Sequence, residues 1–240
     1  MKKDLFSVGD EPALRHGGGF EPDPAERKAV PARPLRDRYE ELRDSVFNEP
    51  FQPDNARTFR AELDRRSARL SGPLRFRITA AAGILGGIAA VPCVFLAGTP
   101  GWGGVVYLTL FGPAAEELLK QLGMLYLLEK RPYTVSRRWQ FPLAAFFGGL
   151  LFATVENLVY AHIYLARLPA AELGRIMAFR WTICTALHVG CTLISGLGLE
   201  RAWRESRQAG TPFNLQPACL YFAAAIALHG LYNLASLFFF

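Results

Sequence analysis

Apolar residues gather into five long stretches in the C-terminal two-thirds of the chain. These stretches cover residues 78–97, 103–128, 141–166, 176–199 and 217–240. Each one reaches or approaches the length of about 20 residues that a helix needs to cross about 30 Å of hydrocarbon. Helices are expected because lipid offers no hydrogen-bond partner to an open backbone group. The pattern therefore predicts an all-α, polytopic membrane helix bundle of about five spans.

The first third of the chain has a different pattern. Residues 1–77 hold 30 of the 48 charged residues in this 240-residue chain. Residues 1–34 are rich in Gly, Pro and charge, which is typical of disorder. Apolar residues at helical spacing predict short helices over residues 35–47 and from Asp54 or Asn55 to about Leu70. We therefore predict a polar, Arg-rich, partly disordered cytoplasmic arm over residues 1–77, followed by a membrane-embedded helix bundle over residues 78–240.

Positive charge alternates between the predicted loops. The loops 129–140 and 200–216 carry four and three basic residues, whereas the loop 98–102 carries none. Cytoplasmic loops of membrane proteins have an excess of Lys and Arg. This bias predicts that the N-terminus lies in the cytoplasm and the C-terminus outside, which agrees with an odd number of spans.

A basic stretch precedes the first span. Seven arginines lie between Arg57 and Arg77, and the net charge of the chain is +6. Basic residues next to a membrane helix are attracted to anionic lipid headgroups. We expect contact with such headgroups near Arg57–Arg77, and no binding of nucleic acid.

Ionisable side chains interrupt four of the five apolar stretches. They are Glu116, Glu117 and Lys120 in the second, Glu156 in the third, His188 in the fourth and His229 in the fifth. Each such group costs roughly 2.5–3.5 kcal/mol at the centre of a membrane helix and therefore usually faces the interior of a bundle. Counted from the predicted outer ends of the spans, the four sets lie within about 5 Å of one depth. The sequence thus predicts one water-accessible site at the midplane.

The residue types in this site suit hydrolysis by an activated water molecule. A semi-buried glutamate can accept a proton from water, and a histidine can orient that water or bind a metal. An amide such as Asn233 can donate to a developing oxyanion. Lys120 lies four residues after Glu116, and Asn157 follows Glu156. We take Lys120, Asn157 and Asn233 as oxyanion-binding or supporting residues of a candidate catalytic set.

Two forms of this chemistry stay open, one with zinc and one without a metal. Glu156, His188 and His229 are candidate zinc ligands, because three ligands on different helices leave a fourth position for water. The chain has no HExxH motif and no two histidines four residues apart. A metal-free mechanism based on glutamate is equally compatible with the sequence.

The order of these motifs resembles the PrsW family of intramembrane proteases, which is related to the CAAX prenyl endopeptidases and the abortive-infection membrane proteins. The residues that carry the resemblance are Glu116-Glu117-x-x-Lys120, Phe152-x-x-x-Glu156-Asn157-x-x-Tyr160, His188 and His229-x-x-x-Asn233, within about residues 80–240. The resemblance implies an endopeptidase, glutamate-dependent or metallo-type, that cuts membrane-anchored proteins in the bacterial plasma membrane. It implies Glu116 as the base, Glu117 as its partner, and His229 with Asn233 as the water-orienting and oxyanion-binding pair.

The resemblance also narrows the range of expected substrates, and two alternative functions stay open. Lys120 replaces the arginine of the EExxxR motif, and the spacing between the glutamate pair and the basic residue is one residue shorter here. Glu156 occupies the position where CAAX proteases have a histidine. We therefore expect site-1 cleavage of a membrane-bound regulator, such as an anti-sigma factor, rather than prenyl-protein processing. The alternatives are a proton- or ion-coupled transporter, because carboxylates and histidines also relay protons, and a non-catalytic membrane scaffold. The lack of an internal inverted repeat argues against the transporter.

Overall fold

The structure is a computed structural model that describes residues 59–96 and 102–239. Within these ranges it consists of helices and connecting turns, with no strand. The predicted disordered segment 1–34, the predicted helix 35–47 and the predicted N-cap at Asp54 or Asn55 lie outside the described residues. The second predicted helix of the arm is present as α2 (Phe59–Ala68).

Four helical stretches of the described chain are long and apolar enough to cross a membrane. They are Gly72–Leu96, Gln140–Tyr164, Ala170–Ala209 and Gln216–Phe238. Their elements are α3 (Gly72–Ala90) and α4 (Pro92–Leu96); α8 (Gln140–Val159) and η6 (Tyr160–Tyr164); α9 (Ala170–Phe179), η7 (Arg180–Cys184) and α10 (Thr185–Ala209); and η8 (Gln216–Ala218) and α11 (Cys219–Phe239). The prediction of an all-α, polytopic membrane bundle is confirmed.

The predicted span 103–128 is a series of shorter helices. They are α5 (Trp102–Val106), the π-helix η4 (Tyr107–Phe111), α6 (Gly112–Lys120) and α7 (Leu122–Lys130). The regular helix is interrupted at Gln121, where φ is −93° and ψ is −1°. Three charged side chains of α6 are buried, and α6 packs against α3, α8, α10 and α11. Its neighbours therefore shield these charges from lipid.

Pro113 lies in the first turn of α6, where the missing N–H of a proline is tolerated. A proline inside an apolar stretch favours a kink or a new helix start, and α6 does begin at Gly112. The amide of Gly112 is nevertheless hydrogen-bonded to the carbonyl of Tyr107 in η4. The helical path is therefore continuous, and the two glutamates of α6 do not lie at an open helix N-terminus.

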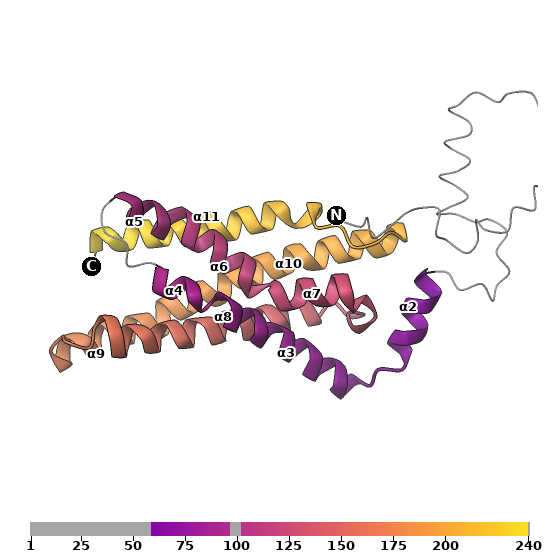
Figure 1. Cartoon of the computed structure of the whole chain (residues 1–240), viewed down its shortest axis with the longest axis horizontal. Coiled ribbons are helices and arrows are strands. Elements are labelled where there is room, and N and C mark those ends of the chain that lie inside the picture. The colour runs from indigo at the N-terminus through magenta and orange to yellow at the C-terminus, as the bar shows by residue number, and fades with distance from the viewer. Residues whose placement is uncertain (1–58, 97–101, 240) are drawn as a thin grey trace, which may run out of the picture. The chain divides into compact units, whose positions relative to one another are not determined.

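The long helices lie side by side, with α3 against α8, α8 against α10, and α10 against α11 (Figure 1). The start of α3 and the ends of α7 and α10 lie at one end of this bundle, and α9, α5 and the end of α11 lie at the other (Figure 1). The basic residues of 129–140 lie at the end of α7 and in the turn after it. The three arginines of 200–216, predicted as a loop, lie in the last turns of α10, which continues to Ala209. We call this the basic end.

Polar contacts attach α2 and the start of α3 to the basic end. Ser71 caps α3, with its hydroxyl accepting from the amide of Leu74. The guanidinium of Arg75 donates to the Ser136 hydroxyl and to the Ser67 carbonyl. Arg75 and Arg77, which the sequence analysis placed in the arm, therefore belong to the first turns of α3.

Glycines allow α3 and α8 to approach closely. A Cβ atom on Gly83 would lie 2.3 Å from the carbonyl oxygen of Ala144, and one on Gly87 would lie 2.7 Å from that of Gly148. Side chains at these positions would push the two backbones apart. Gly83 and Gly87 are spaced as in the GxxxG motif of close helix packing, and their partner is α8 of the same chain.

We expect Gly83→Ala to lower the free energy of unfolding by about 1–3 kcal/mol, because overpacking forces backbone shifts. Thermal unfolding in detergent micelles, followed by circular dichroism, measures this change. Gly190→Ala in α10 is the matched control, since nothing lies within 4 Å of its added Cβ. The control should unfold at or above the wild-type temperature, because Ala favours a helix over Gly by about 1 kcal/mol. Equal losses in both variants would contradict the close packing.

Candidate active site

Six ionisable side chains from four helices meet inside the bundle. They are Glu116, Glu117 and Lys120 of α6, Glu156 of α8, His188 of α10 and His229 of α11. All are buried except Glu156, which is partly buried. The structure thus brings together every ionisable residue that depth counting had placed at the midplane.

Lys120 occupies the centre of this cluster. Its Nζ donates to Glu117 Oε1 at 2.8 Å and to His188 Nδ1 at 3.1 Å, and it lies 3.6 Å from Glu116 Oε2. The ammonium group also lies 4.2 Å from the ring centroid of Phe152. A buried charge is tolerated only when it is paired and hydrogen-bonded, and Lys120 meets both conditions.

The contacts of His188 determine which of its ring nitrogens carries the proton. A lysine ammonium can only donate, so His188 Nδ1 accepts from Lys120. The proton of the neutral ring is then on Nε2, which lies 2.8 Å from Glu156 Oε2 and donates to it. The same carboxylate oxygen lies 2.9 Å from Arg180 Nη2. Glu156 therefore contacts both an imidazole and a guanidinium.

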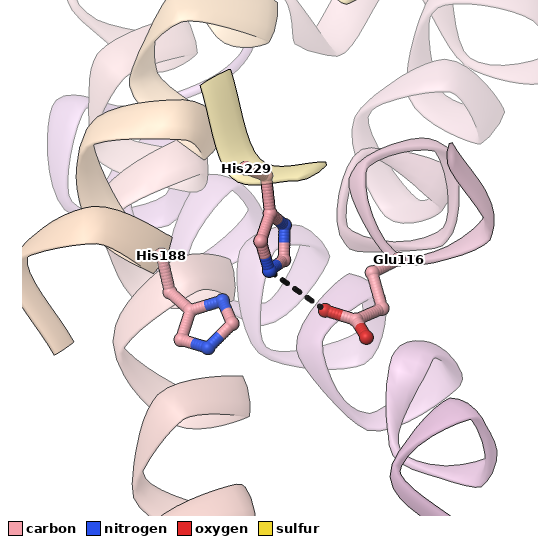
Figure 2. A group of neighbouring side chains, drawn as sticks. All are labelled: Glu116, His188 and His229. Carbon is pink, nitrogen blue, oxygen red and sulfur yellow. Dashed lines mark ion pairs between the residues drawn. The ribbon is translucent and has the colours of Figure 1, made fainter. Parts of the chain in front are cut away.

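His229 is oriented by the second glutamate of α6. Its Nδ1 lies 3.0 Å from Glu117 Oε1. An ionised carboxylate only accepts, so Nδ1–H donates and the neutral ring presents the lone pair of Nε2 on its other side. That Nε2 lies 3.7 Å from Glu116 Oε2, the contact drawn in Figure 2. A carboxylate behind an imidazole is the arrangement that fixes metal-binding histidines.

Glu116 differs from its neighbour in one respect. Its Oε2 atom is buried and has no hydrogen-bond partner among the described residues. Buried polar atoms in folded proteins almost always have a partner, which is often a water molecule or an ion. The carboxylate of Glu116 is therefore positioned to receive a ligand.

Glu116, His188 and His229 could hold a metal ion. Each offers one ligand atom, and these atoms all lie within 4.8 Å of one another. Figure 2 shows the three side chains converging from three helices. One carboxylate and two imidazoles suit zinc with an open position for water. The residues fit such an ion, provided that His188 releases one of its two hydrogen bonds.

This group overlaps with the three ligands predicted from the sequence but is not identical to them. Glu156 was predicted beside His188 and His229, and Glu116 takes its place in the group that the structure brings together. Glu156 instead contacts His188 Nε2 and Arg180. It thus lies behind the imidazole as a supporting carboxylate.

A cavity of about 520 Å³ adjoins the cluster, and Glu116, Glu156 and His188 line it. Residues Leu165, Leu168 and Ser236 also line it, so it extends away from the basic end of the bundle. Its remaining walls are largely apolar, as in most ligand sites. The volume is sufficient for several amino-acid side chains of a peptide.

Three π-helical turns surround this cavity. Tyr107 of η4, Tyr160 of η6 and Arg180 of η7 all line it. Single π turns inside α-helices are frequent at functional sites. The wider turn leaves backbone carbonyls that need other donors, and two asparagines supply them.

Asn157 and Asn233 are those asparagines. The Asn157 amide donates to Thr185 Oγ1 at 3.1 Å and to the Arg180 carbonyl at 3.4 Å. The Asn233 amide donates to the carbonyl of Leu108 in η4 at 2.9 Å. Both residues therefore support the backbone, and one Asn233 N–H is already in use where a donor to an oxyanion was expected.

The catalytic set predicted from the sequence did not include Arg180, Thr192 and Gln121, although Arg180, Cys184 and His188 follow one another at four-residue spacing. The Thr192 hydroxyl lies 3.3 Å from Glu117 Oε2, and Gln121 Nε2 donates to the Thr192 carbonyl at 2.8 Å. Thr192 follows His188 by four residues, and Arg180 precedes it by eight. This spacing on one helical path was the available signal.

A bundle of membrane-crossing helices that encloses carboxylates and imidazoles beside a cavity has the groups that an intramembrane hydrolase needs. A family model described as PrsW family intramembrane metalloprotease matches residues 74–240. The chain belongs to this family and is an intramembrane protease. Searches of curated proteins and of solved structures found no match. Family membership sets aside the transporter and scaffold alternatives.

We expect Lys120→Met to destabilise the protein by about 3–5 kcal/mol, the usual cost of removing one partner of a buried ion pair. The substitution keeps most of the side-chain volume but leaves Glu117 without a cation in the interior. Thermal unfolding in detergent measures the loss. Lys130→Met is the control, because the side chains of Lys130 and Glu129 are 61% and 69% exposed. Exposed pairs contribute about 0–1 kcal/mol, so similar losses in both variants would argue against a central role for Lys120.

Proposed function

We propose that Glu116 and His229 activate the water molecule that hydrolyses a peptide bond of a membrane-anchored protein. The supporting observation is that the unpartnered Glu116 Oε2 lies 3.7 Å from His229 Nε2 beside the cavity. A water molecule between these two atoms would donate to both. Glu116 would accept its proton as a general base while the oxygen attacks the carbonyl carbon.

The other residues of the cluster act through these two. Glu117 holds the His229 ring by its Nδ1–H, and Lys120 offsets the charge of Glu117. Glu156 holds His188, whose ring packs edge-on to that of His229 at a centroid distance of 4.8 Å. In the last step, the proton on Glu116 passes to the amine nitrogen as the C–N bond breaks.

Zinc is compatible with the same residues. Held by Glu116, His188 and His229, it would polarise the carbonyl and acidify bound water. Glu116 would then be a ligand. One nitrogen of His188 would have to become free, either Nε2 from its hydrogen bond with Glu156 or Nδ1 from its hydrogen bond with Lys120. The metal-free form needs neither rearrangement. We therefore retain both forms and separate them by experiment.

The position of the cavity supports a substrate that enters from outside the cell. The cavity extends toward the end of the bundle opposite the basic end. By the positive-inside bias, the basic end would face the cytoplasm in a bacterial plasma membrane, with arginines such as Arg75 and Arg77 near anionic headgroups. The N-terminus would then be cytoplasmic and the end of α11 outside. Cleavage near the outer leaflet is site-1 cleavage, as for an anti-sigma factor.

We expect Glu116→Gln and His229→Ala each to lower cleavage by at least about 10²-fold, the usual contribution of an acid–base group. The assay reconstitutes the full chain in vesicles with a library of epitope-tagged single-span proteins and follows the products by mass spectrometry. Glu205→Gln is the control, because Glu205 pairs with Arg201 on the exposed surface of α10. Undiminished cleavage by Glu116→Gln would contradict its proposed role as the base.

Metal content distinguishes the two forms of the mechanism. If zinc is used, elemental analysis of purified protein should find it in the wild type and in Glu156→Gln, and should find little in His229→Ala. Treatment with a chelator should then abolish cleavage, and added zinc should restore it. Retention of zinc by His229→Ala would exclude the proposed ligand set. Full cleavage by protein without metal would establish the metal-free form.

A further inference from the structure

Arg180 brings a positive charge to the cavity wall, beside the carboxylate–histidine cluster. Its Nη2 lies 2.9 Å from Glu156 Oε2, and it lines the cavity together with Glu116 and His188. The contact with Glu156 is an ion pair without hydrogen-bond alignment, and Nε and Nη2 have no hydrogen-bond partner among the described residues. A guanidinium carries five N–H donors, so Arg180 retains donors for a ligand.

The orientation of this guanidinium is fixed. Its central carbon lies 3.4 Å from the ring centroid of Tyr160, which stacks against it. The Asn157 amide holds the Arg180 carbonyl in the first residue of η7. Stacking and pairing restrict a planar guanidinium more than a lysine ammonium could be restricted. A fixed donor plane is the property that electrostatic catalysis requires.

Four other polar groups near the cavity already have partners. The Asn233 amide donates to Leu108, and His229 Nδ1–H donates to Glu117. The hydroxyl of Tyr107 donates to the Cys93 carbonyl, and that of Tyr232 contacts the Cys184 thiol. The pair expected from the sequence to bind an oxyanion therefore has fewer donors to offer than Arg180.

We propose that Arg180 binds the carbonyl oxygen of the scissile peptide bond and stabilises the negative charge that develops there; this inference rests on the hydrolytic function proposed above. The water oxygen bonds to the carbonyl carbon, its proton passes to Glu116, and the C=O π pair moves to the oxygen that Arg180 contacts. When this pair re-forms the C=O bond, the C–N bond breaks and the amine nitrogen takes the proton from Glu116.

Arg180 could instead only offset the charge of Glu156, and a double-mutant comparison separates the two roles. If Arg180 contacts the oxyanion, Arg180→Gln should lower kcat by about 10²–10³-fold with a small change in KM. Arg180→Lys should recover only part of this loss, since it keeps the charge but not the planar donors. The Glu156→Gln/Arg180→Gln double variant should then be no more active than Arg180→Gln. Recovery of kcat in the double variant would overturn the proposal.

Binding of two inhibitors tests the same contact without turnover. The probes are a leucine phosphinic pseudopeptide, whose tetrahedral group is anionic, and its uncharged hydroxyethylene counterpart, titrated calorimetrically into the detergent-solubilised full chain. The wild type should prefer the phosphinate, and Arg180→Gln should lose about 10²-fold of that affinity while binding the uncharged probe unchanged. Arg175→Gln, an exposed arginine of α9, is the matched control.

The outcomes separate this inference from the proposed function. If Glu116→Gln is inactive but Arg180→Gln keeps the wild-type kcat and phosphinate affinity, the oxyanion role fails and the hydrolytic function stands. If the wild type does not prefer the phosphinate, the inference is also overturned. If Arg180→Gln weakens the binding of both probes equally, Arg180 shapes the cavity and does not interact with the negative charge of the phosphinate. This result would also overturn the proposal.

Discussion

The buried ion pair between Lys120 and Glu117 is the interaction on which the geometry of the site depends. Lys120 also donates to His188 Nδ1, and Glu117 also accepts from His229 Nδ1–H. The two partners of one ion pair thus determine the orientation and the protonated nitrogen of both imidazoles. Such pairs add little net stability compared with apolar packing, but they can select one arrangement among many.

Close backbone contacts keep this pair away from lipid and water. A Cβ on Gly86 of α3 would lie 2.1 Å from the carbonyl oxygen of Lys120, and one on Gly123 of α7 would lie 2.0 Å from that of Ala82. The helix that carries the pair, α6, and the helix after it, α7, therefore both touch α3 at the backbone. Small residues at helix interfaces permit this approach in membranes, where lipid-tail exclusion provides little driving force. The glycines of α3 thus allow the close helix packing that buries the charged side chains of α6.

Hydropathy and residue counting predicted the helix bundle and the common depth of its ionisable residues. The fixed rise per residue along a helix gives the depth of a side chain, whichever way the side chain points around the helix axis. The rotation of each helix about its axis decides which side chains touch, and residue counting does not predict this rotation. Glu156 was therefore a candidate metal ligand, whereas in the structure its carboxylate contacts His188 Nε2. The π turns add to the difficulty, since η7 changes the angular position of Arg180 relative to His188. The interruption at Gln121 likewise has no proline or glycine of its own to signal it.

The carboxylates of Glu116 and Glu117, which are adjacent in α6, lie in different environments. This difference argues that they have different roles. Glu117 lies within hydrogen-bond distance of Lys120, His229 and Thr192, and its side chain is 0% exposed. Glu116 lines the cavity, and one of its oxygens has no hydrogen-bond partner. A carboxylate whose oxygens are already bonded would have to break those bonds to accept a proton from water, whereas an unpartnered one does not. This difference supports the proposal that Glu116 is the base and that Glu117 holds His229 in place.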